Sequence, residues 1–224
     1  MKKILRFAKI APLTLFSLLV IACENLDVVG TGSIQSFDQV LRQSPQLITG
    51  DGGCWSLAAP DGSARFLWAK DFAETALDAA LELDAAPFIA AGLDPAKLPG
   101  HFTLGDGRLV TGRDLGREKL QYRGEATPLA SYEHIVKLER KAIGYHADLD
   151  HYGVDLGEGN LFEWAKDLRA NDKDIVFVLN PDPFIAAGVD PHRIEGWVFD
   201  KVKVDDEKGR PIQVDKFLKP FNLF

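Results

Sequence analysis

Apolar and polar residues follow one another in the same order twice along this chain. The segment Phe66–Gly100 matches the segment Phe162–Gly196 without a gap, at a constant shift of 96 residues and with 16 of 35 positions identical. Similarity at a fixed shift is typical of a repeated structural unit. The sequence therefore predicts a tandem duplication with the same backbone in both copies. Because a copy of roughly 70 residues buries little surface alone, the two are expected to pack together about a pseudo-two-fold axis.

The second strand of each copy has its own pattern. Every residue of Ile175–Leu179 is apolar, which predicts a central strand that is covered on both faces. In Leu77–Asp84 apolar and polar residues alternate, which predicts one inward and one outward face. Asp78 and Glu82 are therefore expected to reach solvent or a groove.

The sequence PFIAAG, present in both copies, predicts a short helix. Its proline is expected at the first helical position, where the missing N–H has no effect, and Gly92 and Gly188 are expected to end the helix in the left-handed conformation. Apolar residues at helical spacing predict two longer helices, over Ser33–Gln43 and over Pro128–Ala142, the second with Ser131 as its cap.

Four turns rich in Gly, Pro, Asp and Asn separate strand-like runs and predict β-hairpins: Pro60–Ser63, Gly105–Gly107, Gly157–Asn160 and Asp205–Gly209. The expected fold class is α+β, mainly antiparallel β hairpins with short helices, in two tandem related repeats packed into one unit. The expected parts are a signal peptide (1–22), a lipid-anchored tether with a short helix (23–45), repeat 1 (46–117), a connecting helix (118–143) and repeat 2 (144–224).

The start of the chain has the pattern of an export signal. Met1–Lys9 is basic, and the apolar run Ile10–Ala22 is shorter than the roughly 20 residues that span a membrane. The run ends in Val20–Cys23, which resembles the lipobox of bacterial lipoproteins. This resemblance implies that residues 1–22 are removed and that Cys23 carries a lipid, which anchors the protein on the extracytoplasmic side of a bacterial membrane. The alternative is an ordinary signal peptide.

The residue after this cysteine bears on location. In Gram-negative lipoproteins an Asp there resembles an inner-membrane retention signal, and the chain has Glu24 instead. The resemblance therefore favours the outer membrane if the cell is Gram-negative.

Charge and cysteine content narrow the function further. The formal net charge is −7, which argues against nucleic acid as a partner and against a charge-driven contact with anionic lipids. The membrane is therefore expected to be reached through the N-terminal lipid. If Cys23 is acylated, Cys54 has no partner for a disulfide and is expected to be a buried thiol.

Candidate chemistry is limited to two groups of residues. His146, Asp148, Asp150 and His151 are close in sequence, and the first three are expected on one face of a strand, where they could hold a metal or form a solvated face. Trp68 and Trp164 could stack a sugar or peptide, or belong to the core. Motifs for a catalytic serine, a phosphate loop, a zinc protease or a dinucleotide cofactor are absent, so no cofactor is expected.

These observations favour a lipid-anchored extracytoplasmic binding or envelope-accessory protein, whose protein or small-molecule partner the sequence leaves open. The alternative is an enzyme, a metal-assisted hydrolase that uses the His146–His151 region. Missing catalytic motifs favour the first function.

Overall fold

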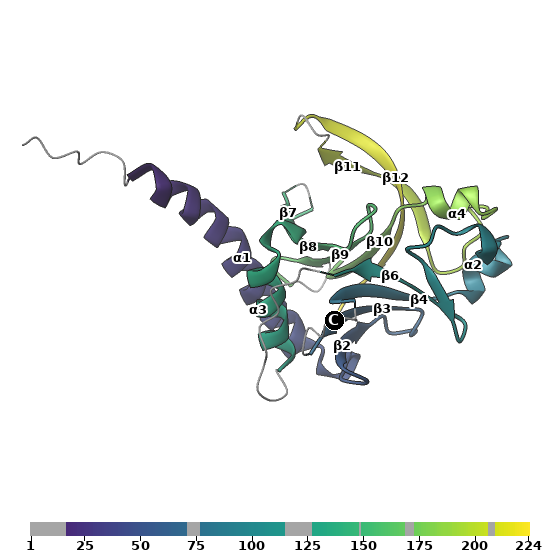
Figure 1. The fold of residues 1–224 in the computed structure, drawn as a ribbon, viewed down its shortest axis with the longest axis horizontal. Helices are drawn as coiled ribbons and strands as arrows, with labels where there is room; N and C mark the ends of the chain where they lie inside the picture. The colour runs from purple at the N-terminus through teal and green to yellow at the C-terminus, as the bar shows by residue number, and fades with distance from the viewer. Residues whose placement is uncertain (1–16, 71–76, 115–126, 148, 169–172, 206–208) are drawn as a thin grey trace, which may run out of the picture.

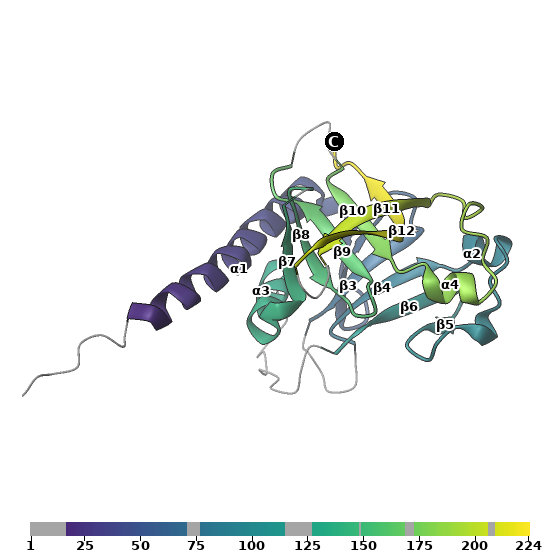
Figure 2. The same ribbon diagram turned by 90° about the horizontal axis from the view of Figure 1, so that it is seen from above.

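The described part of the chain folds into two antiparallel sheets of six strands each, which face one another across a hydrophobic core (Figures 1 and 2). The computed structural model describes residues 17–70, 77–114, 127–147, 149–168, 173–205 and 209–224. Helices α1 and α3 cover one end of the sheets, and the short helices α2 and α4 lie at the other end (Figure 1). The prediction of antiparallel hairpins with short helices is confirmed.

The first sheet is built from the first half of the chain. Its strands are β1 (Ile48–Thr49), β2 (Cys54–Ala58), β3 (Ala64–Ala69), β4 (Ala79–Asp84), β5 (Thr103–Gly105) and β6 (Arg108–Arg113). They lie in the order β1-β2-β3-β4-β6-β5. The predicted turns at 60–63 and 105–107 connect β2 to β3 and β5 to β6, as expected.

The second sheet is built from the second half. Its strands are β7 (Ile143–His146), β8 (His151–Asp155), β9 (Leu161–Ala165), β10 (Ile175–Leu179), β11 (Val198–Asp205) and β12 (Pro211–Phe221). They lie in the order β7-β8-β9-β10-β12-β11, so the six strands of both sheets have the same order and direction. The predicted turn at 157–160 connects β8 to β9. Of the turn predicted at 205–209, between β11 and β12, residues 206–208 lie outside the described residues.

The core lies between the inner faces of the two sheets, where alternate residues of each strand meet. Phe66 of β3 stacks on Phe162 of β9, with ring centroids 4.2 Å apart and planes inclined by 5°. Trp68 and Trp164 each lie two residues further along the same two strands. Both contact Phe37 of α1, with ring centroids 5.5 Å and 5.1 Å apart. All five side chains are fully buried.

Helices α2 (Ala86–Ala90) and α4 (Asp182–Ala186) meet at the opposite end of the core. The amide of Asp94 donates to Ala187 O, and the amide of Asp190 donates to Ala91 O, both at 2.9 Å. The two hydrogen bonds are equivalent, because Asp94 and Ala91 match Asp190 and Ala187 at the shift of 96 residues. The proline is the second residue of each helix rather than the first, which satisfies the same requirement within the first turn.

The glycines after these helices have the predicted left-handed conformation, with φ of +108° at Gly92 and +103° at Gly188. A Cβ on Gly92 would lie 2.7 Å from Gly188 O, and a Cβ on Gly188 would lie 2.9 Å from Gly92 O. Both the backbone angle and the close approach of the two chains therefore require glycine.

Helix α1 differs from the expectation at the N-terminus. It runs without a break from Ser17 to Gln43, so residues 24–32 are helical rather than an extended tether. Its first part projects away from the sheets, and its later part packs beside α3 (Figures 1 and 2). No helix among the described residues is long and apolar enough to cross a membrane.

Helix α3 (Pro128–Leu138) forms where it was expected, but with another cap. Thr127 accepts a hydrogen bond from the amide of Ala130, whereas Ser131 is buried within the helix. Pro128 fixes this start, because proline is favoured at the first helical position. Three short 3-10 turns, η1 (Pro45–Leu47), η2 (Pro95–Lys97) and η3 (Arg140–Ala142), follow helices or loops.

The predicted burial of β10 is confirmed, whereas the predicted inward and outward faces of Leu77–Asp84, which includes β4, are partly wrong. Every residue of β10 is buried, whereas in the first half Asp78 is fully buried and Leu77 is 41% exposed. The counterpart Asp174 is also fully buried, and its carboxylate accepts a hydrogen bond from the amide of Leu223. A buried acid is therefore a feature of this position, because it precedes the strand and is covered by more distant chain, which alternation cannot reveal.

The prediction that Cys54 is a buried thiol is also wrong. Cys54 is half-buried at the start of β2 rather than fully buried. It lies on the outer face of the first sheet, because its neighbour Trp55 pairs with the inward-facing Trp68.

Candidate functional site

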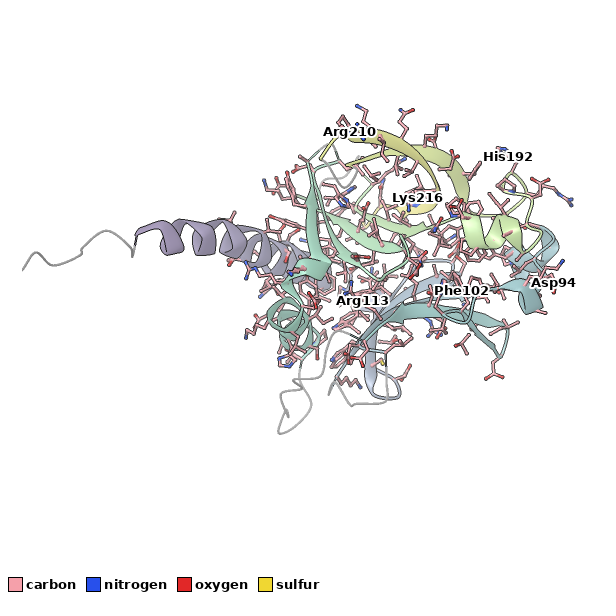
Figure 3. The ribbon with its side chains drawn as sticks, turned by 45° about the horizontal axis from the view of Figure 1, so that its top comes forward. Asp94, Phe102, Arg113, His192, Arg210 and Lys216 are labelled. Carbon is pink, nitrogen blue, oxygen red and sulfur yellow. The ribbon has the colours of Figure 1, made fainter. Side chains whose placement is uncertain are left out.

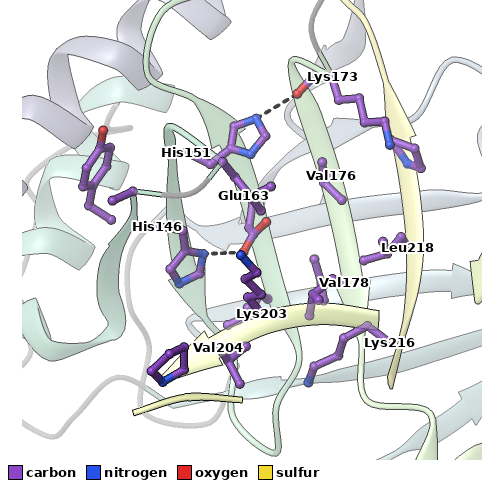
Figure 4. A pocket seen from close by; sticks show the side chains of 17 residues that line it. His146, His151, Glu163, Lys173, Val176, Val178, Lys203, Val204, Lys216 and Leu218 are labelled. Carbon is purple, nitrogen blue, oxygen red and sulfur yellow. Dashed lines mark hydrogen bonds and ion pairs between the residues drawn. The ribbon is translucent and has the colours of Figure 1, made fainter. Parts of the chain in front are cut away.

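The outer face of the second sheet carries a cavity of about 520 Å³ (Figure 4). Its floor is formed by outward-facing residues of β8, β9, β10 and β12, and its cover by the far end of the β11–β12 hairpin. The cavity is lined by Tyr145, His146, Ala147, Leu149, His151, Leu161, Glu163, Lys173, Val176, Val178, Val202, Lys203, Val204, Pro211, Lys216, Leu218 and Pro220.

The length of β12 creates the cover. Residues Phe217–Phe221 pair with β10, whereas the earlier part of the strand, Pro211–Lys216, pairs with β11 alone. The hairpin therefore continues beyond the edge of β10 and arches over the sheet (Figure 1). Figure 3 shows Lys216 beneath this arch, with Arg210 near its far end. This cover explains why the outward-facing Val176 and Val178 are apolar and buried.

A histidine–glutamate pair lies on the floor of the cavity. Nδ1 of His146, at the end of β7, lies 2.7 Å from Oε1 of Glu163 on β9. Glu163 is only 3% exposed, and a buried carboxylate is costly unless it is paired. The hydrogen bond to Glu163 raises the pKa of His146 above its usual value, although burial opposes this change.

Strand β8 lies between these two residues, and its sequence leaves room for their contact. Gly153 is opposite Glu163 in the sheet register. A Cβ on Gly153 would lie 3.3 Å from Cγ of Glu163 and 3.8 Å from Cε1 of His146. The absence of a side chain at this position lets the pair close across the middle strand.

His151 lies directly opposite His146 in the β7–β8 pairing and faces the same cavity (Figure 4). Its Nε2 lies 2.9 Å from the carbonyl oxygen of Lys173, so in a neutral ring this nitrogen is the donor and Nδ1 is the acceptor. His151 is 6% exposed, and its buried Nδ1 has no hydrogen-bond partner among the described residues. The site thus holds a buried polar atom that no described residue satisfies.

Three lysines complete the polar lining. Lys216 is buried and donates to Gly159 O at 2.7 Å. Burial lowers the pKa of Lys216 below its ordinary value, although Asp182, Glu163 and Asp155 oppose this change. Lys173 and Lys203 are exposed at the rim. Among the described lining residues, Glu163 is the only carboxylate.

The structure separates the predicted metal candidates. His146 and His151 face the cavity, whereas Asp150 is exposed and accepts a hydrogen bond from the Tyr145 hydroxyl. The expected common strand is wrong, because β7 ends at His146 and a turn follows in which Asp150 has φ +54°. Asp148 lies outside the described residues. In the described part of the chain, no group of three or more His, Cys, Asp or Glu side chains is placed to hold a metal ion.

The two tryptophans lie far from this cavity, in the core between the sheets. Trp68 and Trp164 are both fully buried, and Nε1 of Trp68 donates to Pro128 O at 3.0 Å. Neither ring exposes a face on which a ligand could stack. Cys23 is part of α1.

Glu163 and Lys216 were not identified from the sequence. Glu163 is the single charged residue of the otherwise apolar β9, and it stands where the matching segment of the first half has Leu67. Lys216 is one of three charged residues in β12, which also contains Asp215 and Lys219. The outer face of the first sheet differs, since Glu82 there pairs with Arg65 and Arg108. A charge present in only one of the two matching segments is the signal that could have identified Glu163.

Comparison with protein-family models, with curated proteins and with solved structures found no match for this chain.

Proposed function

We propose that this protein is a lipid-anchored extracytoplasmic binding protein, and that the cavity beneath the β11–β12 hairpin is its small-molecule site. The observation that carries the proposal is a cavity of about 520 Å³ with an apolar floor and three buried polar residues. Small-molecule sites are typically apolar pockets of about 300–1,000 Å³ with a few placed polar groups. Burying a carboxylate such as Glu163 is costly, so a buried glutamate is not expected on a face that serves only to stabilise the fold.

A neutral apolar dye tests this site without involving its charges. N-phenyl-1-naphthylamine should bind the protein with increased fluorescence, and Val178→Phe should abolish that binding, since the added ring fills the cavity from its floor. Val198→Phe on β11 is the matched control, because Val198 is exposed and lies outside the cavity lining. Dye binding that Val178→Phe leaves unchanged, in a variant that melts like the parent, would contradict the proposal.

The membrane anchor is a separate part of the proposal and rests on the Val20–Cys23 sequence. Cys23→Ser should abolish metabolic labelling with a fatty acid and release the protein from membranes. Unchanged labelling of this variant would show that Cys23 is not the attachment site. An outer-membrane location is favoured by Glu24 if the cell is Gram-negative.

A metal-assisted hydrolase stays the second candidate, since His146 and His151 face one cavity beside a buried carboxylate. Zinc that binds at one equivalent, and that His151→Ala removes, would favour it over the binding protein.

We also propose that the two halves are tandem copies related by a pseudo-two-fold axis. Three observations support this: the same strand order, the reciprocal hydrogen bonds of Asp94 and Asp190, and the stacking of Phe66 on its counterpart Phe162. On this view the two copies have diverged at the cavity, because the floor residues of copy two differ from those of copy one.

A further inference from the structure

We propose that the cavity takes an amphipathic anion, a molecule with an apolar body and one carboxylate or phosphate head. This inference rests on the proposed function, because it names the ligand class of the same cavity. It depends on two features of the lining: the apolar floor and cover, and the excess of lysine over free carboxylate.

The apolar body is matched by both sides of the cavity. Val176 and Val178 of β10 and Leu218 of β12 form the floor, and Val202 and Val204 of β11 face them from the hairpin. The buried floor side chains and the covering hairpin enclose an apolar chain on two sides. Removing apolar surface from water contributes about 25 cal/mol per Å², so this enclosure favours an elongated apolar group.

The lysines of the lining match the head. Lys173, Lys203 and Lys216 line the cavity, and none of them has an ion-pair partner among the described residues. The only lining carboxylate, Glu163, is already paired with His146. The positive charge is therefore local, since the whole chain has a net charge of −7.

The position of the three lysines in the lining differs. Lys216 is buried and lies on the same face of β12 as Leu218 of the floor, whereas Lys173 and Lys203 are exposed at the rim. Lys219, three residues from Lys216 on β12, lies outside the lining and pairs with Asp61 at 2.8 Å. Lys216 is therefore the ammonium group best placed to meet the head of a ligand.

The buried polar groups favour an acid over a neutral or cationic ligand. An anion near Lys216 would offset the cost of burying its ammonium group, which a neutral molecule cannot do. Nδ1 of His151, the acceptor of a neutral ring, can take a hydrogen bond only from a head group that carries a donor, such as the P–OH of a singly protonated phosphate. A cationic amphiphile would meet the buried ammonium group of Lys216 and a carboxylate that is already paired.

The test compares three compounds with one chain length: decanoate, decyl phosphate and decanol. Each is titrated below its micelle concentration into the full chain carrying Cys23→Ser, which lacks the anchor, and binding is followed by displacement of N-phenyl-1-naphthylamine. At least one anion should bind about tenfold more tightly than decanol, which corresponds to roughly 1.4 kcal/mol. Added salt should weaken the anion and leave decanol unchanged. The stronger of the two anions identifies the head group.

The variants are Lys216→Gln, at the buried lysine of the lining, and Lys201→Gln, at an exposed lysine outside it. Lys216→Gln should weaken anion binding about three- to tenfold without affecting decanol, and Lys201→Gln should change neither. Equal affinity for decanol and both anions, or an anion preference that Lys216→Gln leaves intact, would overturn the inference while the dye still reports a working cavity. A protein that binds no dye at all would instead contradict the proposed function.

Discussion

At the scale of single residues, the polar side chains on the mainly apolar floor of the cavity stabilise one another. The carboxylate of Glu163 is buried and accepts a hydrogen bond from His146, and Gly153 leaves the space through which they meet. Removing one member of a buried pair leaves the other without its partner, which costs more than the pair itself contributes. His146 is therefore expected to affect both stability and ligand binding through Glu163.

The His146–Glu163 pair predicts a pH dependence of stability. The folded pKa of His146 is raised above its ordinary value of 6.5, so its stabilising contribution is fully present below 6.5 and is lost as the pH rises through the folded pKa. His146→Gln should therefore lower the melting temperature more at about pH 5.5 than at about pH 8.5.

A variant of Glu163, the hydrogen-bond partner of His146, provides the control for this prediction. In a Glu163→Gln background, His146→Gln should have nearly the same effect at both pH values, because the charge interaction is gone. Urea unfolding at the two pH values measures the difference, and a larger effect at the higher pH would contradict the assignment.

At the scale of elements, the two halves approach each other closely where α2 and α4 end. Gly92 and Gly188 both have positive φ, and each would place a Cβ within 3 Å of the other's carbonyl oxygen. Two separate requirements therefore apply to one residue type: a backbone angle that favours glycine, and space for only a hydrogen atom.

Gly92→Ala and Gly188→Ala should each destabilise the protein by about 1–3 kcal/mol, by similar amounts because their surroundings are equivalent. Gly62→Ala is the matched control, since Gly62 has φ +69° but nothing within 4 Å of the added Cβ. It should cost only the backbone strain, about 1 kcal/mol. If all three variants lose the same free energy of unfolding, the close approach of the two halves has no energetic effect.

At the scale of the whole molecule, the two sheets behave as parts of one core. Phe37 of α1 contacts both Trp68 and Trp164, and Phe66 stacks on Phe162. Lys219 of β12 adds a polar link, since its ammonium group donates to Asp61 in the β2–β3 turn at 2.8 Å. Neither sheet can separate from the other without exposing these rings, so one cooperative unfolding transition is expected.

The link between Lys219 and Asp61 predicts an acid dependence of stability. Partial burial alone would raise the pKa of Asp61, but hydrogen bonds from Lys219 and Ser63 lower it from 3.8 to about 2. Its contribution is therefore present above 3.8 and is lost as the pH falls towards 2. Asp61→Asn should lower stability at neutral pH by a small amount, because Asp61 is 56% exposed and solvent screens the pair.

The difference between Asp61→Asn and the parent should disappear near the lower pKa. Asp51→Asn, in the preceding loop, is the control for a change of net charge alone. Denaturant unfolding over this acidic range measures both variants, and a difference that persists at the acid end would show that Asp61 acts through something other than its charge.

The sequence by itself determined the local structure of this protein. Period-two alternation and the Gly, Pro and Asp turns predicted the hairpins, and the fully apolar Ile175–Leu179 predicted the buried central strand, because these signals act between near neighbours along the chain. Only the tertiary structure decided which outward faces are covered. Asp78 is buried and Val178 faces a cavity because distant chain segments lie over them, and no local pattern records that arrangement. The site could not be predicted from the sequence for the same reason. His146, Glu163 and Lys216 line one cavity only because β12 continues past the end of β10 and arches over the sheet.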